Sequence, residues 1–133
     1  MAGTLESRTL TVRIDRPYRE VYAFVSLPEN LPRWAAGLGK SIGLVDGEWV
    51  AETSQGPVRV RFTERNDLGI LDQSVTPPAG TEVYIPMRVI ANGGGSEILF
   101  TLFHLADMTD EQFAADAALV EQDLQRLKRL LEA

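Results

Sequence analysis

The last 25 residues of the chain, Thr109–Ala133, have the pattern of one long amphipathic helix. Their apolar residues recur at alternating steps of four and three, the spacing of one helix face, and these are Phe113, Ala117, Val120, Leu124, Leu127 and Leu131. Thr109 and Gln112 fit a capping box at the start of the helix. About 23 helical residues span roughly 34 Å. A helix of this length with one apolar stripe needs a broad surface to cover, which only the preceding residues can supply.

The residues before this helix show the alternation and the turn residues of antiparallel strands. A strand is expected from Thr9 to Ile14, followed by a helix that Pro17 opens and a shorter helical segment from Pro28 to Trp34. Six strands then follow between turns, and Asp46-Gly47 is the strongest hairpin signal. This order predicts an α+β fold, in which the terminal helix covers the apolar face of a seven-stranded antiparallel sheet.

Composition excludes several classes of function. We expect one domain over residues 1–133, with an apolar fraction of 44% and a net charge of −6 that disfavours binding to nucleic acid. No apolar run approaches the ~18 residues of a membrane-spanning helix, and no acidic cluster has the spacing of a metal site. The chain has no cysteine, and its first residues lack the profile of a signal peptide. We therefore expect a cytoplasmic protein without a metal or another cofactor.

Several segments are similar to those of one known superfamily. The Pro-led helix Arg16–Val25, the segment Leu27–Trp34 with its tryptophan, and stretches such as Asp46–Trp49 and Pro86–Val89 resemble the START-like polyketide cyclase/dehydrase and lipid-transport superfamily (SRPBCC proteins). The resemblance runs from about Thr9 to Glu132. It implies a helix-grip fold, in which a curved sheet wraps around the C-terminal helix and leaves a cavity between them. Members include cyclases, carriers of hydrophobic ligands and co-chaperones, so the resemblance leaves the activity open.

Hairpin geometry predicts which side chains face the terminal helix. A pairing of Ala91 with Ser96 would place three apolar pairs on the inward face and Val83 opposite His104; the three pairs are Val89 with Ile98, Met87 with Phe100, and Ile85 with Leu102. Similarly, Phe62 is expected opposite Leu71 on one neighbouring strand and opposite Trp49 on the other, with Gln73 pointing inward. The candidate ligand-binding residues are Tyr22, Trp34, Trp49, Phe62, Gln73, Met87, Phe100 and His104.

The polar candidates each have a structural and a functional interpretation. His104, the only histidine, is either a hydrogen-bonded residue near the core or an acid–base group that contacts a ligand. Gln73 either forms a structural hydrogen bond or orients a ligand. Asp72 and Arg88 are expected on the outer face as part of a surface charge ladder of small stabilising value. A slip of one residue in the register would instead turn both inward as a catalytic pair.

Three functions agree with this pattern. The first is binding of a small, largely apolar molecule, such as a lipid, a polyketide or an aromatic metabolite. The second is cyclase, aromatase or dehydratase chemistry in the same cavity, with His104 as the acid–base group and with Tyr22, or an inward Arg88, polarising a carbonyl. The third is a protein-interaction module of the co-chaperone type. A homodimer that pairs through an exposed edge strand is also expected.

Overall fold

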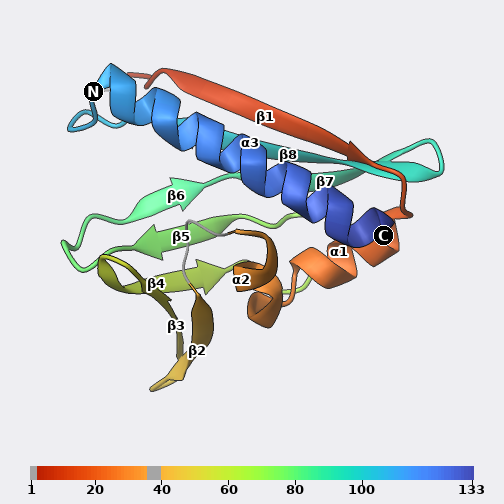
Figure 1. Cartoon of the computed structure of the whole chain (residues 1–133), viewed down its shortest axis with the longest axis horizontal. Coiled ribbons are helices and arrows are strands. Elements are labelled where there is room, and N and C mark those ends of the chain that lie inside the picture. The colour runs from red at the N-terminus through yellow and green to blue at the C-terminus, as the bar shows by residue number, and fades with distance from the viewer. Residues whose placement is uncertain (1–2, 36–39) are drawn as a thin grey trace.

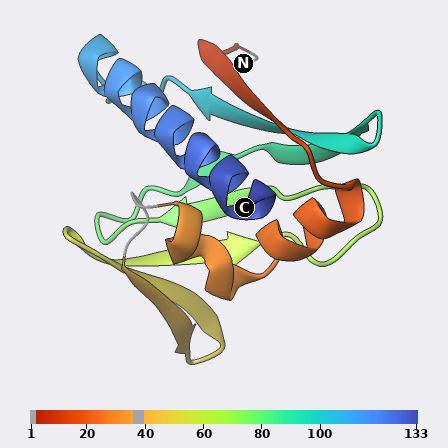
Figure 2. The ribbon, with the colours of Figure 1, turned by 45° about the vertical axis from the view of Figure 1, so that its right-hand side comes forward.

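The computed structural model describes residues 3–35 and 40–133, and its architecture is α+β. Two antiparallel sheets, with strand orders β1-β8-β7 and β2-β3-β4-β5-β6, lie on one side of a long C-terminal helix (Figure 1, Figure 2). The strands are β1 (Ser7–Ile14), β2 (Ser41–Val45), β3 (Glu48–Thr53), β4 (Gly56–Phe62), β5 (Gln73–Thr76), β6 (Val83–Ile85), β7 (Met87–Asn92) and β8 (Gly95–Phe103). The helices are α1 (Tyr18–Val25), the short 3-10 helix η1 (Pro28–Asn30), α2 (Leu31–Trp34) and α3 (Asp110–Glu132).

The terminal helix α3 forms as its sequence pattern predicts. The Thr109 side chain accepts the backbone N–H of Gln112 (3.1 Å), and the Gln112 side chain accepts the N–H of Thr109 (2.8 Å), which confirms the capping box. The predicted apolar stripe is buried at Phe113, Ala117, Leu124 and Leu127 and half-buried at Val120 and Leu131. Burial of this stripe supplies most of the stability of such a helix, because helix propensity alone contributes little in water.

Polar contacts attach the last turns of α3 to the end of β1. Lys128 Nζ donates to the carbonyl of Arg13 (2.7 Å), and a Glu132 carboxylate oxygen accepts the N–H of Asp15 (2.7 Å). The guanidinium of Arg16 donates to the carbonyl of Leu131 (2.9 Å). The hydrogen bond from Asp15 and the nearby Lys128 lower the pKa of Glu132. These contacts satisfy one of the carbonyl groups that a helix leaves unpaired at its C-terminus.

The prediction of seven strands in one sheet is wrong, because the strand expected from Thr81 to Ala91 divides at Pro86. Its first half, β6, pairs with β5, and its second half, β7, pairs with β8. Pro86 has no N–H to donate, so the ladder is interrupted there, while its carbonyl accepts the N–H of Thr101 (3.0 Å). Beyond the interruption, an isolated antiparallel bridge pairs Ile70 with Arg88 in the same register as β5 with β6. The two sheets are therefore joined where the segment before β5 pairs with β7.

The predicted faces of the strands are correct, although four predicted pairs are not, since Ile85 pairs with Gln73 rather than Leu102 and three further pairs differ. Phe62 pairs with Gln73 rather than Leu71, and Trp49 pairs with Val60 rather than Phe62. Val83 pairs with Val75 rather than His104. The errors at Phe62 and Trp49 are shifts of two residues, which keep each side chain on the same face because the strand period is two. The residues of all three apolar pairs predicted to face α3 are buried or packed against the core.

The turn at Asp46-Gly47 is the hairpin connection that its sequence predicts. Both residues have positive φ, 52° for Asp46 and 81° for Gly47, as a type I′ turn requires. The turn joins β2 to β3, which lean away from the other strands in Figure 2. No helix among the residues that the structure describes combines the length and apolar character needed to cross a membrane.

Candidate functional site

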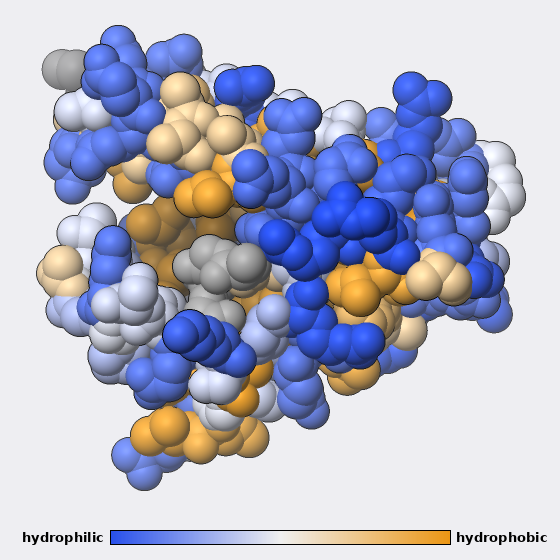
Figure 3. Space-filling model, in the orientation of Figure 1, coloured by the Kyte–Doolittle hydropathy of each residue, from blue (hydrophilic) through white to orange (hydrophobic). Residues whose placement is uncertain are grey.

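A hollow with a hydrophobic floor lies between the N-terminal half of α3 and the region of β5 and β6 (Figure 3). The backbone of α3 runs close to β1 and α2 but approaches β4, β5 and β6 at few points. Phe62 and Val83 are on the inward face of these strands, and each packs against the core while remaining only half-buried. The space between helix and five-stranded sheet is therefore the candidate functional site.

Four of the predicted ligand-binding residues form a row along the inward side of the strands. Phe62 on β4 pairs with Gln73 on β5, and Met87 on β7 pairs with Phe100 on β8. The two pairs meet where the Gln73 amide contacts the sulfur of Met87 (3.9 Å). Trp49 on β3 extends the row, because its ring meets that of Phe62 edge to face, with centroids 6.5 Å apart. Residues from five strands therefore lie next to one another on the inward side and form a mostly apolar and aromatic row.

Two polar side chains interrupt this apolar surface. Gln73 is 3% exposed, and within residues 3–35 and 40–133 the hydrogen-bond partner of its amide is the Met87 sulfur, a weak acceptor. Asp116 is half-buried on α3, between the inward-facing Phe113 and Val120. Burial raises the pKa of Asp116, and no hydrogen bond or ion pair to it occurs in the part of the chain that the structure describes. Asp116 is not among the candidates predicted from the sequence, although its place beside the apolar stripe is visible there.

His104 lies just beyond β8, and both of its ring nitrogens have protein partners. Nε2 is 2.8 Å from the carbonyl of Met108, and Nδ1 is 3.3 Å from a carboxylate oxygen of Glu6. The ring stacks on Phe113 of α3, with centroids 4.8 Å apart. These contacts join β1, β8 and the start of α3. They match the structural interpretation of His104, because both of its ring nitrogens contact groups that hold segments of the chain together.

We expect the contribution of His104 to stability to depend on pH. The hydrogen bond to the Met108 carbonyl and then that to Glu6 raise the pKa of His104 above its usual 6.5. A histidine whose pKa rises on folding stabilises the protein fully below the unfolded value, and this contribution is lost as the pH rises through the folded value. Urea midpoints of wild type and His104→Gln should therefore differ more at about pH 5.5 than at about pH 8.5. An equal difference at both pH values would contradict a charged His104 in the folded protein.

Tyr22 and Trp34 lie away from the row and are held by structural contacts. The Tyr22 hydroxyl accepts the N–H of Asn66 (2.8 Å), and its ring stacks on Tyr18 (6.3 Å between centroids). Trp34 is 2% exposed, and its carbonyl accepts a hydrogen bond from Arg126 of α3 (2.9 Å). The indole N–H of Trp34 is buried, and no residue that the structure describes accepts a hydrogen bond from it. Tyr22 therefore secures the loop before β5, whereas Trp34 joins α2 to α3.

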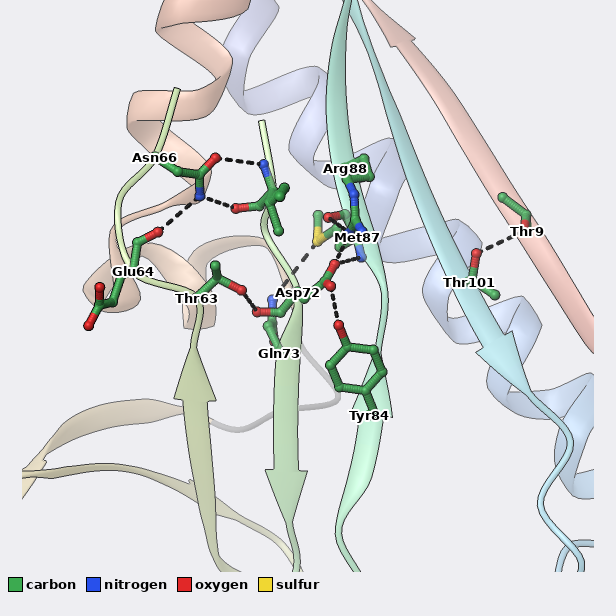
Figure 4. A network of polar contacts seen from close by, with 11 residues as sticks. Thr9, Thr63, Glu64, Asn66, Asp72, Gln73, Tyr84, Met87, Arg88 and Thr101 are labelled. Carbon is green, nitrogen blue, oxygen red and sulfur yellow. Dashed lines mark hydrogen bonds and ion pairs between the residues drawn. The ribbon is translucent and has the colours of Figure 1, made fainter. Parts of the chain in front are cut away.

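Asp72 and Arg88 form an ion pair on the outer face, but the predicted solvated ladder is wrong. Asp72 is only 8% exposed and accepts hydrogen bonds from the Arg88 guanidinium and the Tyr84 hydroxyl (Figure 4). It also accepts the backbone N–H of Met87 (2.8 Å), directly after the interruption at Pro86. The hydrogen bond to Asp72 raises the pKa of Tyr84. Asp72 therefore stabilises the junction between the two sheets by its hydrogen bonds to Met87 and Arg88. This junction contact lies on the face opposite to the hollow.

A second groove, of about 470 Å³, lies on the five-stranded sheet. Its lining includes Arg59, Arg61, Ser74 and Thr76 of the outer face and also the apolar Trp49, Val60 and Phe62. Glu48 pairs with Arg59 there (3.7 Å). Polar side chains dominate this groove, so it is less suited to an apolar molecule than the hollow beneath α3. Within residues 3–35 and 40–133, no cluster of three or more His, Asp or Glu side chains could hold a metal ion.

Comparisons with known proteins identify the fold. No family model and no curated protein matches the sequence. An uncharacterised protein from Bacillus thuringiensis has a similar structure, with a TM-score of 0.75, 16% identity, and coverage of 95% of this chain and 98% of that one. The Aha1 dimer from Colwellia psychrerythraea matches with a TM-score of 0.71 and 16% identity, over 96% of this chain and 97% of that one.

A third structure comes from a biosynthetic locus. DynU16, a protein of the dynemicin biosynthetic locus, matches with a TM-score of 0.71 and 14% identity, over 96% of this chain. The match covers 47% of DynU16, so this chain spans about half the length of that protein. Identities this low show a shared fold and nothing finer. The chain has a helix-grip-like α+β fold.

Proposed function

We propose that the protein binds a small, largely apolar molecule between its five-stranded sheet and α3. The observation that carries this proposal is the hollow with a hydrophobic floor beneath the N-terminal half of α3 (Figure 3). Ligand sites for small molecules are concave, mostly apolar, and carry a few polar groups that orient the ligand. The half-buried Phe62 and Val83 supply apolar surface, with Met87 and Phe100 buried in the core behind them, and the half-buried Asp116 and the nearly buried Gln73 are the polar groups. On this proposal the chain is a single domain similar to the START-like, or SRPBCC, proteins.

A binding role has more support than cyclase or dehydratase chemistry. Both ring nitrogens of His104 already have partners, and the pair formed by Asp72 and Arg88 lies on the opposite face of the sheet. General acid–base catalysis needs a group within hydrogen-bond reach of the reacting atoms. His104→Gln, which cannot exchange a proton near neutral pH, is therefore expected to bind ligand as wild type does. The homodimer remains a prediction, with β1 an edge strand of its sheet.

Filling the hollow tests the proposal directly. Val83 is half-buried on the inward face of β6, so Val83→Trp should occupy the space that a ligand would take. We expect this variant to bind the neutral dye Nile red more than about tenfold more weakly than wild type, since the dye would meet the indole ring. The measurement is the fluorescence titration of the dye at a temperature where both proteins are folded.

A matched control separates filling from general disruption. Glu82→Trp adds the same ring to the preceding residue, which is exposed and lies on the other face. We expect its dye affinity to equal that of wild type. Equal dye binding by wild type and Val83→Trp would place the dye elsewhere and reject the proposed site. Native mass spectrometry of protein purified from its host would then identify any co-purifying molecule.

A further inference from the structure

Asp116 is a carboxylate in a mostly apolar setting. It follows Phe113 by three residues and precedes Val120 by four, so on a helix its side chain lies beside both. Phe113 is buried against the rest of the protein and Val120 packs on the core. Asp116 itself is half-buried. The side chain therefore lies on the flank of α3 that borders the sheet rather than on its solvent face.

The position of this flank along the helix places Asp116 over the hollow. Seven residues later, on the same flank, Asp123 pairs with Arg126 (2.9 Å), which also donates to the carbonyl of Trp34 in α2. The flank thus faces α2 in the C-terminal half of α3. Asp116 lies two turns nearer the N-terminus, about 10 Å along the axis, where the hollow opens beneath α3 (Figure 3).

Among the residues that the structure describes, no group neutralises Asp116 or donates a hydrogen bond to it. Neither a hydrogen bond nor an ion pair of Asp116 occurs in residues 3–35 and 40–133. Partial burial of a carboxylate without a partner costs free energy, and a donor that approaches it recovers part of that cost. A second carboxylate would instead be repelled, more strongly than in water because the surroundings are apolar.

From this placement we propose that the hollow selects apolar molecules that carry a hydroxyl or a protonated amine and rejects those that carry a carboxylate, with Asp116 as the selecting residue. This inference rests on the proposed function, because it concerns the ligand of the same hollow. Gln73, 3% exposed, is a second polar group on the sheet side, and its amide contacts the sulfur of Met87. The expected ligand class is therefore apolar amines and alcohols rather than fatty acids.

Competition between matched probes tests the selectivity. Nile red bound to the protein is displaced with decylamine, decanol or decanoate, which share one apolar chain, below their micelle concentrations. Wild type should bind decylamine and decanol more tightly than decanoate. In Asp116→Asn the preference for decylamine over decanoate should fall by about tenfold or more, as expected for loss of a hydrogen bond to a charged group.

The control removes the same charge elsewhere on the helix. Glu121 is exposed on α3, so Glu121→Gln changes the net charge of −6 by one unit, as Asp116→Asn does. The preference of Glu121→Gln for decylamine over decanoate should equal that of wild type. If Nile red binds but Asp116→Asn keeps the wild-type preference, or Glu121→Gln loses it equally, the role of Asp116 is rejected and the binding function remains. If wild type binds neither Nile red nor any probe, the proposed function itself fails.

Discussion

Leu124→Asp should unfold the protein at room temperature. Leu124 lies in the middle of the α3 stripe and is 2% exposed, within the main core cluster. The substitution removes about 2–5 kcal/mol of buried apolar contacts and adds the cost of a buried carboxylate without a partner. Small domains have only about 5–15 kcal/mol of total stability. We expect the far-UV circular dichroism spectrum of the variant to be that of an unfolded chain.

The same substitution on the outer side of α3 is the control. Leu119 is 50% exposed on the same helix, so Leu119→Asp places an identical charge where water solvates it. Its urea midpoint should lie close to that of wild type, within about 0.5 kcal/mol. A folded Leu124→Asp with a normal midpoint would mean that α3 does not pack on the sheets in solution.

Asp72→Ala should destabilise the protein by about 2–3 kcal/mol. Asp72 accepts the buried N–H of Met87 as well as hydrogen bonds from Arg88 and Tyr84. The side chain of Arg88 is 42% exposed and Tyr84 is 51% exposed, so both recover hydrogen bonds to water. The buried Met87 N–H cannot reach water, so the loss of its hydrogen bond to Asp72 accounts for most of the destabilisation. Urea denaturation at neutral pH measures the difference.

Asp72→Asn separates the acceptor from the charge. The amide oxygen of asparagine can still accept the N–H of Met87. The free energy of unfolding of this variant should therefore fall by less, about 1 kcal/mol. A surface charge ladder, as the sequence predicts for Asp72, would make both substitutions nearly neutral. A change below about 0.5 kcal/mol in Asp72→Ala would therefore support the sequence-based interpretation over the structural one.

Local chemistry explains what could be predicted from the sequence. The start of α3 at Thr109 depends on a capping box that residues three apart form between themselves. The Asp46-Gly47 turn depends on two residues that tolerate positive φ. The inward faces depend on a strand period of two, so they survive the two-residue errors at Phe62 and Trp49. Each of these features is determined within a few neighbouring residues.

The burial and the partners of Asp72 and His104 depend on contacts between residues far apart in the chain. Asp72 becomes buried only because the hairpin brings Tyr84 and Arg88 beside it and because Pro86 leaves the N–H of Met87 next to its carboxylate. His104 finds Glu6 across 98 residues of sequence. No local pattern contains such pairs. The alternation of the strands and the apolar stripe of the helix could be predicted because they follow from the regular periods of the backbone. Burial and hydrogen-bond partners are determined only when distant segments pack together.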